Sequence, residues 1–290
     1  MQIAVLADIH GNLPALEAVL NDARFYDVDG FIIAGDLTVG PEPVAIFKRL
    51  DNLNTWIVLG NNDDYMIRFH SNTGPTYWYT SQQWALVRHS YTLLDPETLK
   101  RLSTLPEQRN IYLDGALPIR VVHGSPRSIT ELIIPDQDMS ILEKAWASIQ
   151  EPVLICGHSH LSWVKYQNGR LALNPGAVCG GLDGDNRAHY AIIRWSEDIW
   201  KVEYRRVPYD INKVRTAFSE TGLLKEGGAL ARAFLISIET GKNTGLDFVN
   251  YAYSKAREMG FVDCEVVPDD IWDSADRSYP WDKAFAGLIP

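Results

Sequence analysis

Two side chains that can bind a metal ion stand two residues apart near the start of the chain. Asp8 and His10 follow the apolar run that begins at Met1, and residues two apart on an extended strand point to the same side. A carboxylate oxygen and a neutral imidazole nitrogen are suitable ligands for a divalent cation. Asp, Asn and Pro after a strand are also ordinary helix-capping residues. Taken alone, the pair is therefore equally consistent with a metal site and with a helix cap.

The same pattern, an apolar strand followed by glycine and a metal-capable side chain, recurs four more times. The five segments together supply two aspartates, four histidines and one asparagine: Asp8, His10, Asp36, Asn61, His123, His158 and His160. This number suffices for three or four ligands to each of two cations when one carboxylate is shared, and Asp36 is the expected bridge. The neighbouring glycines would let the loops approach closely, because glycine lacks a Cβ.

The apolar patterns between these segments predict strands that alternate with helices. The N-terminal part is expected to contain, after the first strand, helix 13–25, strand 31–34, helix 43–50 and strand 55–59. Such alternation indicates βαβ units and a parallel sheet. Ligands of these sheets gather beyond the carboxyl ends of the strands, where Asp8, Asp36 and Asn61 fall.

The rest of the chain is predicted to add a helical cap, a second sheet and a helical extension. The expected elements are helical segment 80–105, strands 111–113, 119–122 and 153–156, helix 140–149, a hairpin turning at 167–169, strands 189–195 and 200–206 in the second sheet, and helices 211–220, 229–238 and 248–259. We therefore expect two regions, 1–207 and 208–290. The acidic segment 263–290 is more typical of a tail that docks on its own domain than of a binding motif, although the sequence leaves both open. Four aromatic side chains would do the docking: Trp272, Tyr279, Trp281 and Phe285.

Composition limits the classes of function. With 46% hydrophobic and 22% charged residues, the chain is typical of a globular protein. No apolar run approaches the roughly 20 residues of a membrane span, and no signal peptide is visible, so we expect a cytoplasmic location and no membrane partner. Three scattered cysteines indicate no disulfide framework. A net charge of -10 argues against binding to nucleic acid but not against a small phosphorylated substrate, because bound cations would reverse the local sign. The oligomeric state is not predicted.

Five short motifs in order along the chain give a specific resemblance. DIHGN, GDLTVGPEP, GNND, VVHGSPR and GHSH, followed by LNPGAV at 173–178, resemble the signature of the calcineurin-like metallophosphoesterases, in particular the small bacterial and archaeal phosphodiesterase branch. The likeness covers roughly residues 1–225. It implies a four-layer α/β/β/α sandwich of two mixed sheets, here with a helical C-terminal extension.

The resemblance also implies a pair of divalent ions and assigns their ligands. Asp8, His10, Asp36 and His160 would hold the first ion, and Asp36, Asn61, His123 and His158 the second. Manganese is the first expectation, with iron, zinc or nickel as alternatives. A water molecule that bridges the ions would be hydroxide near neutral pH and could attack phosphorus. The expected activity is therefore hydrolysis of phosphodiesters or activated phosphomonoesters.

Four other residues near the motifs are candidates for substrate binding or catalysis. Asn12 and Arg127 could hold phosphate oxygens, although a solvated loop charge is an equally good interpretation of Arg127. Much of the family has a histidine, thought to protonate the leaving oxygen, where this chain has Asn62. Asparagine cannot transfer a proton at neutral pH, so we expect slow turnover of alkyl phosphomonoesters and faster turnover where the leaving group is acidic. Asp63 could orient the same loop.

Two other functions are compatible with the motifs. An interaction module of the same fold with little turnover would be expected to lack metal ligands, and none is missing from the motifs. A protein serine/threonine phosphatase is the enzymatic alternative, although that branch usually keeps the loop histidine. Hydrolysis of bis-p-nitrophenyl phosphate with manganese and then with chelator would separate the enzymes from the interaction module.

Overall fold

The first of two sheets contains the N-terminal strand. The computed structural model describes residues 1–284, and the sheet has the order β10-β9-β1-β2-β3. Its strands are β1 (Gln2–Leu6), β2 (Gly30–Ile33), β3 (Thr55–Ile57), β9 (Ala188–Ser196) and β10 (Ile199–Val207). The first three are parallel, as the βαβ pattern predicts, whereas β9 runs antiparallel to both β1 and β10.

The second sheet has the order β4-β5-β6-β8-β7. Its strands are β4 (Gln108–Ile111), β5 (Ile119–Val122), β6 (Val153–Ile155), β7 (Ser162–Gln167) and β8 (Arg170–Pro175). β4 lies a few residues earlier than the predicted strand 111–113. The turn between β7 and β8 is the predicted one, and Asn168 and Gly169 have the φ values of 52° and 73° that a tight two-residue hairpin turn requires.

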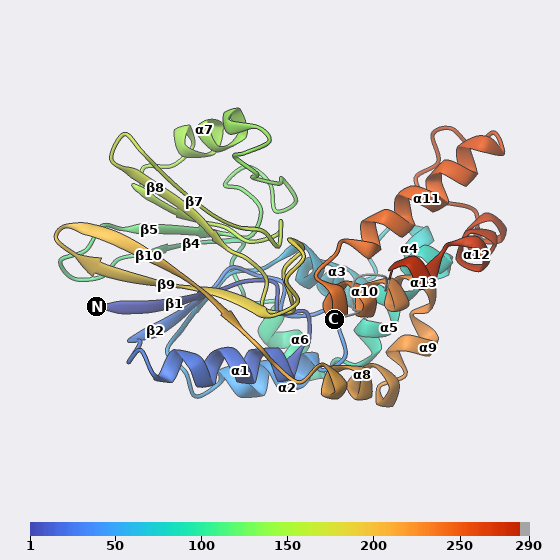
Figure 1. The fold of residues 1–290 in the computed structure, drawn as a ribbon, viewed down its shortest axis with the longest axis horizontal. Coiled ribbons are helices and arrows are strands. Elements are labelled where there is room, and N and C mark those ends of the chain that lie inside the picture. The colour runs from blue at the N-terminus through green and yellow to red at the C-terminus, as the bar shows by residue number, and fades with distance from the viewer. Residues whose placement is uncertain (285–290) are drawn as a thin grey trace.

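The two sheets pack face to face between outer helices (Figure 1). α1 (Leu13–Arg24) and α2 (Pro43–Leu50) cover the first sheet, and α7 (Met139–Ala147) covers the second. Both faces of β1 are buried because its side chains alternate: Ile3 and Val5 pack between the sheets, whereas Ala4 and Leu6 pack under the helices. The predicted α/β/β/α sandwich of two mixed sheets is thus confirmed.

The position of β9 and β10 corrects one prediction. Strands 189–195 and 200–206 are predicted in the second sheet, but β9 pairs with β1 and extends the first sheet, with Ile193 opposite Ile3. The loop after Pro175 carries the chain from one sheet to the other. Periodicity identifies a strand but not its partner, because partner choice depends on contacts distant in sequence.

Helices form the other half of the molecule (Figure 1). They are α3 (Asn61–His70), α4 (Thr76–Thr80), a 3₁₀ turn (Gln82–Trp84), α5 (Ala85–Thr92), α6 (Pro96–Leu102), α8 (Ile211–Glu220), α9 (Leu223–Glu226), α10 (Gly228–Thr240), α11 (Thr244–Glu258), α12 (Asp269–Ser278) and α13 (Trp281–Ala284). Residues 208–240 share a hydrophobic core with α1: Val214 and Phe218 belong to the same buried cluster as Leu16. No helix within residues 1–284 is long and apolar enough to span a bilayer.

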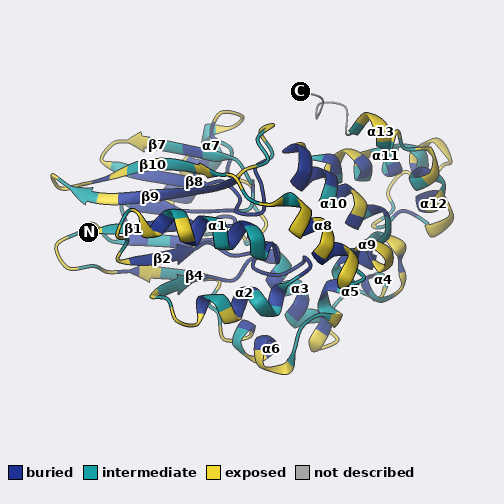
Figure 2. Ribbon diagram, turned by 60° about the horizontal axis from the view of Figure 1, so that its bottom comes forward, coloured by how far each residue is buried: buried dark blue, intermediate teal, exposed yellow. Residues whose placement is uncertain are grey.

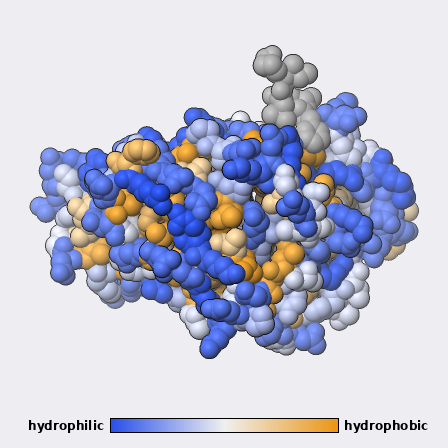
Figure 3. Space-filling view, turned by 90° about the horizontal axis from the view of Figure 1, so that it is seen from below, coloured by the Kyte–Doolittle hydropathy of each residue, from blue (hydrophilic) through white to orange (hydrophobic). Residues whose placement is uncertain are grey.

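The segment after residue 263 packs on α11 through aromatic side chains. Trp272 is 2% exposed and meets Phe248 edge to face at 5.0 Å, and Trp281 lies 5.1 Å from the same ring. Phe285, the fourth aromatic residue of the predicted docking set, lies outside the described residues. Figure 2 shows the inner strands of both sheets and the inner faces of the helices buried, whereas the edge strands β4, β7 and β10 are partly exposed. Figure 3 shows apolar atoms exposed on the lower face near the junction of the sheet and helical halves.

Candidate metal centre

The ends of the parallel strands carry side chains that the backbone turns toward one point. Asp8 follows β1 and Asp36 follows β2, with φ of 54° and 56°. Five of the seven predicted metal ligands have such positive φ values: Asp8, His10, Asp36, His158 and His160. This conformation is uncommon for residues other than glycine and persists where the surrounding structure enforces it. Local strain at the strand ends therefore aims these side chains at a shared centre.

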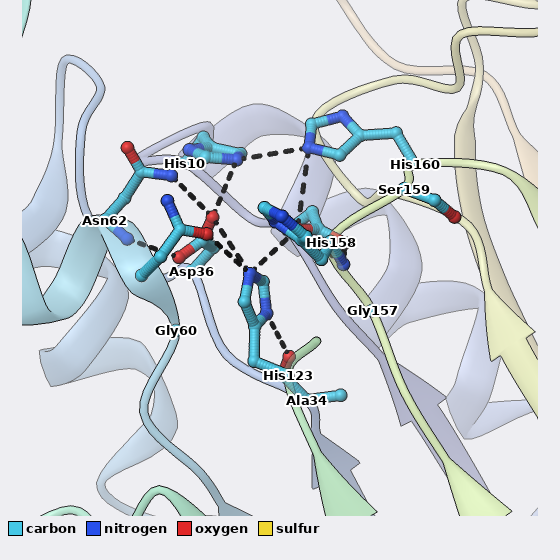
Figure 4. Close-up of polar contacts among 12 residues, drawn as sticks. His10, Ala34, Asp36, Gly60, Asn62, His123, Gly157, His158, Ser159 and His160 are labelled. Atoms are coloured by element: carbon cyan, nitrogen blue, oxygen red, sulfur yellow. Dashed lines mark hydrogen bonds and ion pairs between the residues drawn. The ribbon is translucent and has the colours of Figure 1, made fainter. Parts of the chain in front are cut away.

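The first group of ligand atoms joins the N-terminal loop to the loop after β6. The Nε2 atoms of His10 and His160 are 3.3 Å apart (Figure 4). His160 Nε2 lies 3.4 Å from Asp8 Oδ1, and His10 Nε2 lies 3.5 Å from Asp36 Oδ2. These four residues are the ones that the resemblance assigns to the first ion.

The second group shares Asp36 with the first. His123 Nε2 lies 3.3 Å from Asp36 Oδ2 and 3.0 Å from Asn61 Oδ1. Asp36, His123 and His158 each offer a ligand atom within 4.8 Å of the others. The structure thus brings all seven predicted ligands together, with the Asp36 carboxylate between the two groups (Figure 4).

Hydrogen bonds outside the cluster orient the histidine rings. His123 Nδ1 lies 2.7 Å from the Ala34 carbonyl, and His10 Nδ1 lies 3.2 Å from the Thr38 carbonyl. When Nδ1 donates its proton to these oxygens, the Nε2 lone pair faces the centre, which is the arrangement typical of metal-ligating histidines. The donor set and its outer hydrogen bonds therefore fit a pair of divalent ions.

The electrostatics of the cluster favour a positive charge at its centre. Burial lowers the pKa of His123, but the Asp36 and Asp8 carboxylates outweigh this and raise it to about 9. Burial lowers the pKa of His10, and burial with neighbouring His123 lowers that of His158 to about 4. Burial also raises the pKa of Asp8 well above its usual value. Most of the histidines are therefore neutral, the form that binds metals, and they surround the Asp36 carboxylate, whose pKa, despite its burial, is lowered by His123.

Two glycines allow the loops to approach this centre. A Cβ added at Gly60 would lie 2.1 Å from Asp36 Oδ1, and one added at Gly35 would lie 2.7 Å from His123 Nδ1. Real Cβ atoms essentially never come this close to another heavy atom. The close approach expected from the neighbouring glycines is thus present at both positions.

Asn62 and Asp63 form hydrogen bonds with the loops that surround the cluster. Asn62 donates to Asp36 twice, from its backbone N–H at 2.9 Å and from Nδ2 at 2.6 Å. Asp63 is fully buried and accepts from the backbone N–H groups of Leu37 and Gly60, each at 3.0 Å, and from the Thr38 hydroxyl at 2.8 Å. Asn62 therefore positions the Asp36 carboxylate, and Asp63 links the loops at Leu37 and Gly60.

Asn12 and Arg127 are not brought to the cluster. Asn12 is fully buried, where its Oδ1 accepts from Ala15 N–H at 3.1 Å and its Nδ2 donates to the Cys179 carbonyl at 3.2 Å. Arg127 forms an ion pair with Glu131 at 2.5 Å. Neither side chain lines the cavity beside the cluster. The structure therefore gives Asn12 the contacts of a helix cap, and the predicted phosphate-binding role gains no support at either residue.

The family comparison decides what kind of protein carries this centre. The calcineurin-like phosphoesterase superfamily domain matches residues 1–198. The chain belongs to this superfamily. All seven predicted metal ligands lie within the matched residues. The family assignment and the clustered side chains therefore concern the same part of the chain.

Known relatives of this calcineurin-like chain include archaeal and bacterial proteins. The uncharacterized protein MJ0912 of Methanocaldococcus jannaschii is 30% identical over 230 residues, 73% of this chain and 89% of its own length. The phosphodiesterase MJ0936 of the same organism is 23% identical over 186 residues, 63% of this chain and 88% of its own length. A metallophosphoesterase from Sphaerobacter thermophilus is 28% identical with a TM-score of 0.67, covering 83% of this chain and 99% of its own.

Two residues beside the centre are not among the predicted site residues. Cys179 is buried in the core, and its Sγ lies 3.9 Å from His160 Nδ1 and can form a ligand group with His10 and His160. Phe234 of α10 packs its ring edge-on at 5.6 Å from that of His10. The only available signal for Cys179 was its position directly after the LNPGAV motif, and nothing in the sequence indicated Phe234.

Proposed function

We propose that this chain is a phosphodiesterase that requires two divalent metal ions. The observation that carries the proposal is the convergence of seven nitrogen and oxygen ligands from five loops, divided into two groups by the shared carboxylate of Asp36. Asp8, His10, Asp36 and His160 would hold one ion. Asp36, Asn61, His123 and His158 would hold the other. Manganese is the metal that we propose to test first.

The chemistry divides between the ions and the protein. When bound, the ions would activate water and stabilise negative charge on the phosphoryl oxygens. The protein positions the ligands: Asn62 fixes the shared carboxylate through two hydrogen bonds, and Asp63 joins the loops at Leu37 and Gly60. This is the expected division of labour in phosphoryl transfer, where positioning and electrostatics dominate.

The residues around the centre also favour particular leaving groups. Asn62 lines the cavity where much of the family has a proton-donating histidine, and an amide does not transfer protons at neutral pH. The leaving oxygen therefore has to depart as an anion or take its proton from water. Esters with acidic leaving groups, such as aryl phosphodiesters, fit this site better than alkyl phosphomonoesters.

Metal content and turnover measured on the same protein test the proposal. Protein purified without added ions is analysed for bound metal, and hydrolysis of bis-p-nitrophenyl phosphate is followed with manganese and then with chelator. We expect activity that appears with manganese and disappears with chelator. His123→Gln should abolish both metal binding and turnover, whereas His70→Gln, an exposed histidine outside the cluster, should preserve both. Metal binding without hydrolysis of any phosphoester would refute the proposed phosphodiesterase activity and favour an interaction module of the same fold.

A further inference from the structure

A cavity of about 630 Å³ opens directly from the proposed metal centre. His10, Asp36 and His158 of the proposed centre line it, together with residues from the loop before α7, from α10 and from the start of α11. A volume of this size is typical of pockets that bury a small organic molecule. The space next to the metal centre is therefore large enough for the organic part of a phosphoester.

The walls of this cavity are mainly apolar. The apolar wall residues include Leu132, Ile134, Leu230, Phe234, Ile238 and Leu246. Leu132 and Leu246 are 45% and 53% exposed, and they come from two different regions of the chain. Large apolar side chains that stay accessible at one pocket typically mark a binding surface.

The described cavity walls carry almost no charged side chains. Among the cavity-lining residues that the structure describes, Asp36 is the only acidic one and none is lysine or arginine. The polar groups outside the metal cluster are uncharged, such as Gln137, Ser237 and Asn243. A substrate with additional phosphate groups would place them in this cavity without a counter-charge from the walls, which is costly.

We infer that, given the phosphodiesterase function proposed above, this cavity selects phosphoesters whose organic group is uncharged and mainly apolar. Phe234 brings the apolar wall to the metal centre itself, because its ring contacts that of His10. The substrate's phosphoryl group would lie at the cluster and its hydrocarbon part against α10 and the start of α11.

The helical extension supplies part of the apolar wall. The family domain ends at residue 198, whereas Leu230, Phe234 and Leu246 lie beyond it. The proposed metal ligands all lie within the family domain, which also supplies Leu132 and Ile134 to the wall. The extension therefore adds to the selection of the organic group without supplying a proposed ligand.

A diester series with a constant leaving group tests the inference by turnover. In methyl, butyl and hexyl p-nitrophenyl phosphate, water replaces p-nitrophenolate on phosphorus and yields the alkyl phosphate and one proton in every case. Each buried methylene contributes roughly fourfold to binding. We therefore expect kcat/KM for the butyl ester to exceed that for the methyl ester by at least about tenfold.

A binding measurement separates the inference from the proposed function. Calorimetric titration of the manganese-loaded protein with methylphosphonate and hexylphosphonate needs no turnover, because the C–P bond is not hydrolysed. Tighter binding of hexylphosphonate supports the inference even if the diesters are not hydrolysed, in which case the proposed function alone fails. Equal binding of the two phosphonates overturns the inference, and continued hydrolysis of the diesters would then leave the proposed function intact.

Two exposed leucines provide matched variants. Leu246→Lys places a charge at the cavity, and we expect it to reduce the preference for hexylphosphonate over methylphosphonate by at least about tenfold. Leu224→Lys is the control, since Leu224 of α9 is 38% exposed and does not line the cavity. Both side chains are accessible to solvent, so neither variant is expected to unfold the protein. An equal loss of preference in both variants, or in neither, contradicts the proposed location.

Discussion

Gly60 offers a direct test of how the loops build the metal centre. Its backbone φ is -97°, which any residue can adopt, so Gly60→Ala introduces no backbone strain. The added Cβ would lie 2.1 Å from Asp36 Oδ1 and 2.3 Å from the Asp36 backbone nitrogen. The substitution therefore acts on the shared carboxylate through space alone.

The size of the expected effect follows from these distances. An ordinary contact begins at 3.4 Å, so the loop at Asp36 or the loop at Gly60 has to move by about 1 Å. A displacement of about 1 Å at a reacting centre lowers the rate roughly a hundredfold. We therefore expect kcat/KM to fall by about two orders of magnitude, together with weaker metal binding and a loss of about 1–3 kcal/mol in the free energy of unfolding from overpacking.

Gly30→Ala provides a matched control for crowding. A Cβ at Gly30 would lie 2.7 Å from Trp56 Cζ3, but Gly30 begins β2 at the end opposite to the metal centre. Metal affinity from manganese titration, kcat/KM on bis-p-nitrophenyl phosphate and thermal unfolding should be measured for both variants. We expect both to lose stability and only Gly60→Ala to lose metal affinity and rate. Wild-type metal affinity and rate in Gly60→Ala would refute the crowding argument.

Three further predictions follow from the same contacts. Asn62→His should raise the rate on alkyl phosphomonoesters by about 10²-fold or more, because histidine can protonate the leaving oxygen; an unchanged rate on poor leaving groups would show that proton transfer does not limit turnover. Manganese at one hundred times its dissociation constant should add about 2.7 kcal/mol of stability, and a melting temperature insensitive to chelator would contradict metal binding. Burial raises the pKa of Asp22, but hydrogen bonds from Arg205 and Tyr190 outweigh it and lower the pKa. The Asp22 carboxyl group therefore binds its proton less tightly in the folded state than in the unfolded chain. The stabilisation of the fold by the Asp22 carboxylate is present above about pH 4 and is lost as the pH falls through the folded pKa. Asp22→Asn should accordingly cost about 1–2 kcal/mol at neutral pH, measured by urea unfolding, and a cost that stays constant down to about pH 3 would refute this reasoning.

The local elements were largely predictable because their signals are local. Helix α2 has the predicted bounds, Pro43–Leu50, and α8 has the predicted bounds Ile211–Glu220. Both show helical spacing of apolar residues, and Asp210 is the N-cap of α8, where its side chain accepts a hydrogen bond from the Asn212 N–H. α3 was not predicted, because its start at Asn61 coincides with a metal-ligand motif and its residues are mainly polar. A helix that begins within a metal-ligand motif is therefore difficult to predict from its apolar spacing.

Long-range arrangement was less predictable. The pattern of β9 indicated a strand but not that it would pair with β1, a partner almost two hundred residues away. Contacts distant in sequence also decide the role of Asn12. Its side-chain amide accepts a hydrogen bond from the Ala15 N–H and donates one to the carbonyl of Cys179, a residue from a distant loop. A residue next to a ligand in sequence can point away from the site, because strand ends and turns rotate successive side chains to different sides.

The sequence by itself determined the type and order of the candidate metal ligands, because residue chemistry and spacing at strand ends are local properties. The alternating strand and helix patterns predicted the parallel βαβ units, and the resemblance to the calcineurin-like family implied the sandwich. Only the tertiary structure decided which sheet receives β9, how Asn62 holds Asp36, and that the extension walls a cavity beside the metal centre. These features arise where segments distant in sequence touch, and contacts of that kind depend on packing that no local pattern encodes.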